Sequence, residues 1–160
     1  MIQRMVRAAL LDGRVYQEVK DDPAATLQAF GVLVLSAIAL ALTWITRLSG
    51  SQGLGLLSLL LTWSVSSALT GWVVLSLLGY WVGRRFLGRT VTLPALLRTI
   101  GFAHVPGVFY ILMVFIRSPL DNVITVAILL WTLVTLIVAV RQTLQVSSVA
   151  GFCFASFGIF

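Results

Sequence analysis

Long apolar stretches separated by short charged segments constrain the fold of this chain more than any other feature. They cover residues 24–46, 54–82, 94–116, 120–140 and 146–160. An α-helix rises about 1.5 Å per residue, so about 20 apolar residues cross the roughly 30 Å hydrocarbon core of a bilayer. The first four stretches have this length. The fifth is shorter, so it is either truncated in this sequence, which we favour, or enters the bilayer without crossing it.

Composition supports a membrane protein. Hydrophobic residues make up 59% of the 160 residues and charged residues 10%, and the mean hydropathy is +1.05. Such a chain has too few polar side chains to cover a water-facing globule. Its net charge of +6 would suggest nucleic acid in a soluble protein, but the basic residues flank apolar stretches. That pattern favours anionic lipid as the partner and no nucleic acid. We therefore expect an all-α polytopic transmembrane helical bundle of about five spans.

The distribution of basic residues predicts the orientation. Residues 1–23 carry eight charges and no apolar core of a signal peptide, so we expect the N-terminus to stay in the cytoplasm. Nine basic residues then lie on the inner side, and only Arg47 and Arg117 lie outside. The nine are Arg4, Arg7, Arg14, Lys20, Arg84, Arg85, Arg89, Arg98 and Arg141. This positive-inside bias favours the orientation with the N-terminus inside. Ten arginines against one lysine favour a bacterium with a GC-rich genome, and we therefore expect the bacterial inner membrane.

The N-terminal segment, residues 1–22, is predicted to be separate from a transmembrane domain of residues 23–160. Residues 2–20 place apolar side chains at helical spacing among charged ones, which favours an amphipathic helix on the inner membrane surface, bent at Asp12-Gly13. The alternative is a frayed, solvated tail. Asp22 is the expected N-cap of the first span, with Pro23 at its first helical position.

Arginines near the inner membrane surface form the first candidate site. Arg84, Arg85 and Arg89 connect the second and third spans, and Arg98 lies close enough to the inner surface to extend to lipid headgroups. Such a cluster can bind anionic headgroups or an acidic patch on a partner. The simpler interpretation, which we favour, is a topology signal.

Small residues form a stripe along the second span. Ser67, Gly71 and Gly79 fall at multiples of four residues. Small residues let helix backbones approach closely in lipid, so we interpret the stripe as a packing surface. The hydroxyl groups of the same span could instead line a polar pathway, although no carboxylate accompanies them.

Aromatic residues suggest an interfacial belt rather than a cofactor site. Several rings, Tyr110 among them, lie near predicted span ends, where Trp and Tyr are enriched. Trp63, Trp72 and Trp131 lie deeper, where core packing or lipid contact is more common than contact with a pigment or quinone. The lone Cys153 and the single histidine indicate no metal cluster. We therefore expect no cofactor.

His104 marks the most unusual position. If the third span begins at Pro94, His104 lies about 15 Å deep, near the bilayer midplane. An ionisable residue at that depth suggests a function by default. However, none of the five acidic residues is predicted inside the hydrocarbon. A proton relay built from this chain alone therefore lacks its carboxylate.

Pro106 supplies a structural explanation for the same stretch. A proline inside a helix frees the carbonyl four residues earlier, that of Phe102, and bends the axis. Gly101 and Gly107 flank the bend and would let another helix approach. A neutral His104 would donate to the freed carbonyl, or to the hydroxyl of Thr132 or Thr135. We interpret Gly101, His104, Pro106 and Gly107 as a kinked packing joint, with a transport site as the alternative.

Several short segments together resemble the bacterial branch of the Yip domain family. They are LD at 11–12, VYQE at 15–18, DPAAT at 22–26, GRR at 83–85, LRTIGFAHVPG at 97–107, LWTL at 130–133 and AVRQ at 139–142. The resemblance implies an all-helical domain of about five spans with a cytosolic N-terminus. Eukaryotic relatives bind Rab-type GTPases in vesicle traffic. This chain lacks their long N-terminal region and their Asp-Leu-Tyr-Gly-Pro motif, so we expect no Rab GTPase partner.

These features favour a non-enzymatic membrane protein that acts as a scaffold, assembly factor or accessory subunit of a larger membrane complex. The alternative is a small transporter or channel that uses His104 and the kink at Pro106. An enzyme is less favoured, because a lone histidine without a nearby acid provides no nucleophile and base pair. Expected partners are anionic lipids and other membrane proteins.

Overall fold

The computed structural model describes residues 2–47, 54–85, 88, 91–116 and 120–145 of the chain. Within these ranges it contains helices and no strand, which confirms the all-α expectation. Two short helices, α1 (Ile2–Ala9) and α2 (Gly13–Asp21), precede the long ones. The rest are α3 (Ala25–Arg47), α4 (Leu54–Arg85), α5 (Leu93–Ala103), the 3₁₀ helix η1 (Val105–Val114) and α6 (Leu120–Leu144).

Four helical stretches in the described residues are long and apolar enough to cross a membrane, so the chain is a multi-pass membrane protein. They are α3, α4, α5 together with η1, and α6. Helix α4 continues to Arg85 and α6 to Leu144, a few residues beyond the predicted span ends. Helical hydrogen bonding does not stop where the apolar pattern stops, which explains the difference. The expected fifth stretch, 146–160, lies outside the described residues.

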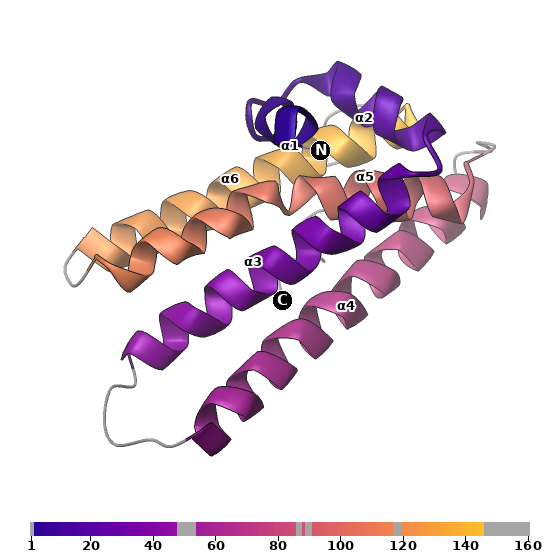
Figure 1. The fold of residues 1–160 in the computed structure, drawn as a ribbon. Coiled ribbons are helices and arrows are strands. Elements are labelled where there is room, and N and C mark those ends of the chain that lie inside the picture. The colour runs from indigo at the N-terminus through magenta and orange to yellow at the C-terminus, as the bar shows by residue number, and fades with distance from the viewer. Residues whose placement is uncertain (1, 48–53, 86–87, 89–90, 117–119, 146–160) are drawn as a thin grey trace.

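The long helices run side by side in alternating directions (Figure 1). Gly83 near the end of α4 lies against Leu144 of α6, and Arg98 of α5 contacts Thr26 of α3, so these termini share one end of the bundle. At the opposite end, the Arg47 guanidinium lies 3.4 Å from the Asp121 carboxylate. Except for Arg47, the described basic residues therefore belong to the first end or to the N-terminal helices beside it.

Helix α5 is the central element of the core. It packs against α1, α2, α3, α4 and α6. Leu96, Ile100 and Phe102 are fully buried, and together with residues from the surrounding helices they form one hydrophobic cluster. The Trp72 indole of α4 donates a hydrogen bond of 2.7 Å to the Leu97 carbonyl of α5. A short helix surrounded in this way fixes the position of the residues that follow it.

The N-terminal helices pack on the bundle rather than on the membrane surface alone. Val15, Tyr16 and Val19 of α2 are buried against α5 and α6. The Trp131 indole donates a hydrogen bond of 2.9 Å to the Ala9 carbonyl. The predicted amphipathic segment therefore directs much of its apolar side toward α5 and α6. This contact removes apolar surface of both partners from solvent. Other apolar side chains of this segment remain exposed, namely Ile2, Val6 and Leu10.

Ion pairs hold the N-terminal segment in this position. Arg4 lies 2.6 Å from the Asp22 carboxylate, and this contact holds the pKa of Asp22 below its usual range. The Arg14 backbone N–H and the Arg7 guanidinium do the same for the pKa of Asp12. Asp22 also accepts from the Ala24 N–H at 3.0 Å. Helix α3 begins only at Ala25, so Pro23 lies in the preceding turn and not at the predicted first helical position.

Candidate functional site

The chain changes its winding at Pro106. Helix α5 ends at Ala103, His104 follows, and the chain continues as the 3₁₀ helix η1 from Val105 to Val114. The predicted kinked α-helix over this stretch was therefore wrong in its second half. Pro106 has no N–H to donate to Phe102, and its ring obstructs α-helical winding. The Gly107 N–H instead donates to the His104 carbonyl at 2.9 Å, a three-residue step typical of a 3₁₀ helix.

Hydroxyl groups from neighbouring helices satisfy carbonyls around this break. Ser36 and Thr43 of α3 donate to the carbonyls of His104 and Tyr110, both at 2.8 Å, and Thr135 of α6 donates to Ala103 at 2.7 Å. Each hydroxyl also lies within reach of a carbonyl of its own helix, but the contact across the helices is the shorter one. Backbone groups left unpaired in hydrocarbon are costly, so these bonds allow the irregular winding.

The His104 ring uses one nitrogen within its own segment. Its Nδ1 lies 2.9 Å from the Ile100 carbonyl oxygen. Because a carbonyl only accepts, Nδ1 carries the proton, and in a neutral ring Nε2 is then an acceptor. The expected partners of His104 were the Phe102 carbonyl and the hydroxyls of Thr132 and Thr135. That expectation was wrong, because Nδ1 bonds the Ile100 carbonyl instead.

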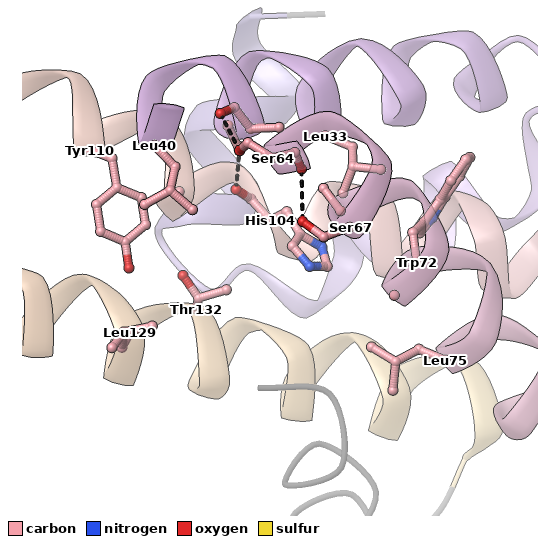
Figure 2. A pocket seen from close by; sticks show the side chains of 15 residues that line it. Leu33, Leu40, Ser64, Ser67, Trp72, Leu75, His104, Tyr110, Leu129 and Thr132 are labelled. Atoms are coloured by element: carbon pink, nitrogen blue, oxygen red, sulfur yellow. Dashed lines mark hydrogen bonds between the residues drawn. The ribbon is translucent and has the colours of Figure 1, made fainter. Parts of the chain in front are cut away.

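A cavity of about 310 Å³ lies between α3, α4, η1 and α6. Figure 2 shows the His104 ring directed into it, between side chains of α4 and α6. Its lining is uncharged and mostly aliphatic, with a few hydroxyl groups. Ser67 and Gly71 of the small-residue stripe and His104 and Gly107 of the joint all line it. The structure thus brings together two candidate sites that are far apart in sequence.

The glycines of these two sites have different surroundings. A Cβ added at Gly101 would lie 2.7 Å from the Ala29 Cβ, and one added at Gly107 would lie 3.0 Å from the Ser36 Cβ. These glycines permit close approach of α3. A Cβ added at Gly71 would meet no atom within 4 Å. Within the described residues, the stripe therefore makes no close helix contact at Gly71. Gly71 and Ser67 are exposed, whereas Gly79 is buried.

Tyr110 is a lining residue that the sequence did not identify. It is only 9% exposed, and its hydroxyl has no hydrogen-bond partner in the described part of the chain. Its predicted place in an interfacial belt was wrong, because η1 turns the ring toward the cavity. A 3₁₀ helix has three residues per turn, so His104, Gly107 and Tyr110 share one face. Counting in steps of three after Pro106 would have found it.

The basic end divides into bonded and exposed arginines. Arg98 donates from Nε to the Thr26 hydroxyl and from a terminal nitrogen to the Lys20 carbonyl, both at 2.8 Å. It therefore fastens α2 and α3 to α5 instead of extending to lipid headgroups as expected. Arg84 and Arg85 are exposed, and Arg84 donates to the Tyr80 hydroxyl at 2.6 Å. Arg89 lies outside the described residues.

The chemistry available in the cavity is hydrogen bonding to an uncharged group. No carboxylate lines it, so His104 has no acidic partner for proton transfer there. Within the described ranges, no group of His, Cys, Asp or Glu residues is placed to hold a metal ion. Cys153 falls in the part that is not described.

A comparison with protein families identifies a relationship that covers most of the chain. A family model described as the Yip1 domain matches residues 11–160, which include helices α2 to α6. The resemblance noted in the sequence is thereby confirmed at the level of the family. Neither the curated proteins nor the solved structures contain a match to this chain.

Proposed function

This chain belongs to the Yip1 domain family, and on that premise we propose that it is a non-enzymatic scaffold, assembly factor or accessory subunit of a larger membrane complex. Its place is the bacterial inner membrane, with the N-terminus in the cytoplasm. Its partners are other membrane proteins and anionic lipids. Rab GTPases and nucleic acids are not among them.

The outward side of α4 carries this proposal. Helix α4 packs against α3 and α5 with one side, and its opposite side is exposed. That exposed side holds Thr62, Ser66 and Thr70 at four-residue intervals, in the middle of a helix of membrane-spanning length. Interfaces between transmembrane helices are enriched in such small and hydroxyl-bearing residues, whereas hydrocarbon offers them no partner. A helix of another protein is therefore the best-supported neighbour.

Apolar residues beside this hydroxyl line would complete the contact. Leu59 is 64% exposed and Trp63 is 73% exposed on the same helix. The Trp63 ring would project into the surface of a partner helix, and the small side chains beside it would leave space for a side chain of that helix. The exposed Arg84 and Arg85 at the end of α4 would meet anionic headgroups or an acidic patch of the partner.

A non-enzymatic role is proposed because the cavity offers no acid and base pair. Neutral His104 is bonded to Ile100 through one nitrogen, and the other cavity-lining polar side chains carry hydroxyls, apart from the Trp72 indole, which donates to Leu97. A general base must lie within hydrogen-bond reach of the proton that it abstracts, and no carboxylate lines the cavity to orient His104 for that role.

Purification from native membranes tests the proposal, and we expect a partner protein in stoichiometric amount. A photoreactive amino acid at position 66 should crosslink this partner, whereas one at the exposed Ala127 of α6 should not. The double variant Ser66→Leu, Thr70→Leu should lose the partner and remain folded, and Ala127→Leu should keep it. Absence of a stoichiometric partner, or equal crosslinking from positions 66 and 127, would contradict the proposal.

A small transporter is the second candidate, and the cavity beside His104 favours it. A flux assay in liposomes with purified protein separates the two. Movement of a solute or of protons that His104→Ala abolishes, with the fold retained, would favour the transporter.

A further inference from the structure

The two N-terminal helices differ in the chemistry of their exposed sides. The exposed residues of α2 are polar or charged, namely Arg14, Gln17, Glu18 and Asp21. On α1 and in the turn after it, the exposed residues are Ile2, Gln3, Val6, Leu10 and Leu11, which are apolar except for Gln3. Ile2 is 77% exposed and Leu10 is 74% exposed. Water suits the exposed side of α2, whereas a group of exposed apolar side chains favours an apolar neighbour.

Helix α1 also lies farther from the basic end of the bundle than α2 does (Figure 1). The Trp131 indole bonds to the Ala9 carbonyl, and Trp131 precedes Arg141 by ten residues of α6, which is about 15 Å of helix. Helix α1 also contacts η1, which begins seven residues after Arg98, about 10 Å farther along its span. Amphipathic helices in a membrane interface bury their apolar side about 5–10 Å below the headgroup boundary. The basic residues mark that boundary, so α1 lies at a matching level.

Charged side chains would oppose contact of α1 with hydrocarbon, but both charged side chains of α1 are paired. The Arg4 guanidinium lies 2.6 Å from the Asp22 carboxylate. The Arg7 guanidinium lies 2.9 Å from the Asp12 carboxylate and 3.0 Å from that of Glu18. These pairs direct both arginines toward α2 and the turns at its two ends. The apolar side of α1 therefore carries no unpaired charge, which would be costly in hydrocarbon.

The surface on either side of α1 belongs to membrane-spanning helices. Arg4 bonds to Gln28 of α3 at 3.4 Å, and the neighbouring Leu27 is 77% exposed. At the other end of α1, Trp131 of α6 has the exposed Val134 one turn away on the same side of its helix. The apolar side of α1 thus continues the exposed apolar surface of two spans.

We propose that α1 is an in-plane membrane helix whose apolar side, formed by Ile2, Val6, Leu10 and Leu11, lies among the acyl chains of the leaflet at the basic end. Helix α2 faces water. The occupant is the acyl chain rather than the headgroup, because both arginines of α1 are already paired. The sequence predicted one surface helix over residues 2–20, whereas here only α1 enters the lipid and α2 directs its apolar side toward protein. The proposal does not depend on the scaffold role.

Spin labelling of the full chain in phosphatidylcholine vesicles tests the proposal. Single nitroxides at positions 6, 10 and 14 are introduced with Cys153→Ser, and position 14 is the matched control on α2. Collisions with oxygen, which concentrates in hydrocarbon, are compared with collisions with a water-soluble nickel complex. We expect the oxygen-to-nickel ratio to be several-fold higher at positions 6 and 10 than at position 14. Adding phosphatidylglycerol should not change it.

Three results of this measurement overturn the proposal. The first is a ratio at positions 6 and 10 no higher than at position 14. The second is protection of position 10 from both reagents, because that result would show a protein cover. The third is a raised ratio only in vesicles that contain phosphatidylglycerol, because headgroups would then hold α1.

Crosslinking identifies what lies against α1. A diazirine amino acid at position 10 of the full chain in the same vesicles should form adducts with phospholipid, and one at position 14 should not. The alternative occupants are a second protein molecule and residues 146–160 of this chain, which lie outside the described residues. Peptide crosslinks from position 10 to either of these, in place of lipid adducts, overturn the proposal. The crosslinking from position 66 tests the scaffold role separately.

Discussion

The segment formed by α5 and η1 and the helix α4 use the same small residue types in different surroundings. In the first segment, Gly101 and Gly107 lie against α3, and hydroxyls from α3 and α6 satisfy the backbone around Pro106. On α4, a Cβ added at Gly71 would meet no atom of the described residues within 4 Å, and Ser66 and Thr70 are exposed. Small residues in a membrane helix therefore mark either an internal contact or a free surface. Neighbouring helices decide which, and the stripe alone does not.

The largest expected effect separates the two glycine positions. Gly101→Ala places a Cβ 2.7 Å from the Ala29 Cβ and 3.2 Å from backbone atoms that cannot move away easily. We expect the free energy of unfolding to fall by about 1–3 kcal/mol, as for other overpacked cores. Gly71→Ala has free space and should be neutral or slightly stabilising. Unfolding in mixed micelles of increasing SDS content measures both. Equal destabilisation of the two variants would remove the distinction between the regions.

The hydroxyl groups offer a second contrast. Thr135→Val leaves the Ala103 carbonyl without its donor at 2.7 Å, and we expect a loss of about 0.6–1.7 kcal/mol in the free energy of unfolding. Thr70→Val removes a bond to Ser66 within the same exposed helix, so its effect should stay below about 0.5 kcal/mol. The same micelle titration compares them. A larger loss from Thr70→Val would mean that the outward side of α4 is not free in the isolated protein.

A smaller effect with the opposite sign is expected at Thr125 on α6. Its hydroxyl is buried and has no hydrogen-bond partner among the residues that the structure describes. Thr125→Val keeps the shape and removes the unsatisfied group, so the free energy of unfolding should rise by up to about 1 kcal/mol. Thr132→Val is the matched control, because Thr132 donates to Ile128 within its own helix. A destabilised Thr125→Val would indicate that this hydroxyl has a partner, such as a bound water.

The sequence predicted what depends on composition and on local chain geometry. Four spans and the position of the break at Pro106 follow from hydropathy and from the missing N–H of proline. The Asp22 carboxylate lies before the first apolar stretch as expected and accepts from the Ala24 N–H, but α3 begins at Ala25, so Asp22 is not its N-cap. The cavity and the exposure of Gly71 depend on how α4 lies relative to α6, which no local pattern contains. Tyr110 was assigned to an interfacial belt from its nearness to a predicted span end, and the 3₁₀ winding that turns its ring toward the cavity is not visible in that distance. Arg98 was assigned to lipid because its bonds to Thr26 and Lys20 join residues distant in sequence.

The smallest expected effect is a pH-dependent loosening of helices α1 and α2, which cover the outer side of α5. Helices α1 and α2 bury the outer side of α5, whereas no such helix covers the exposed side of α4 in the described residues. Ion pairs of Asp12 and Asp22 help to hold α1 and α2 in place. Both carboxylates have a pKa lowered in the folded chain. Their contribution is therefore complete above their ordinary pKa of about 3.9, and it is lost as the pH falls below that value through the folded pKa values.

Acidification should thus loosen the N-terminal helices and make the outer side of α5 resemble that of α4. A nitroxide label at the exposed position 3, in a chain with Cys153→Ser, should gain mobility reversibly as the pH falls from about 4 toward 2. A label at the exposed position 59 on α4 should not change, because no carboxylate holds that helix in place. If position 3 keeps its mobility down to pH 2, apolar contacts of Val15, Tyr16 and Val19 suffice to hold the cover. The ion pairs would then contribute only to its orientation.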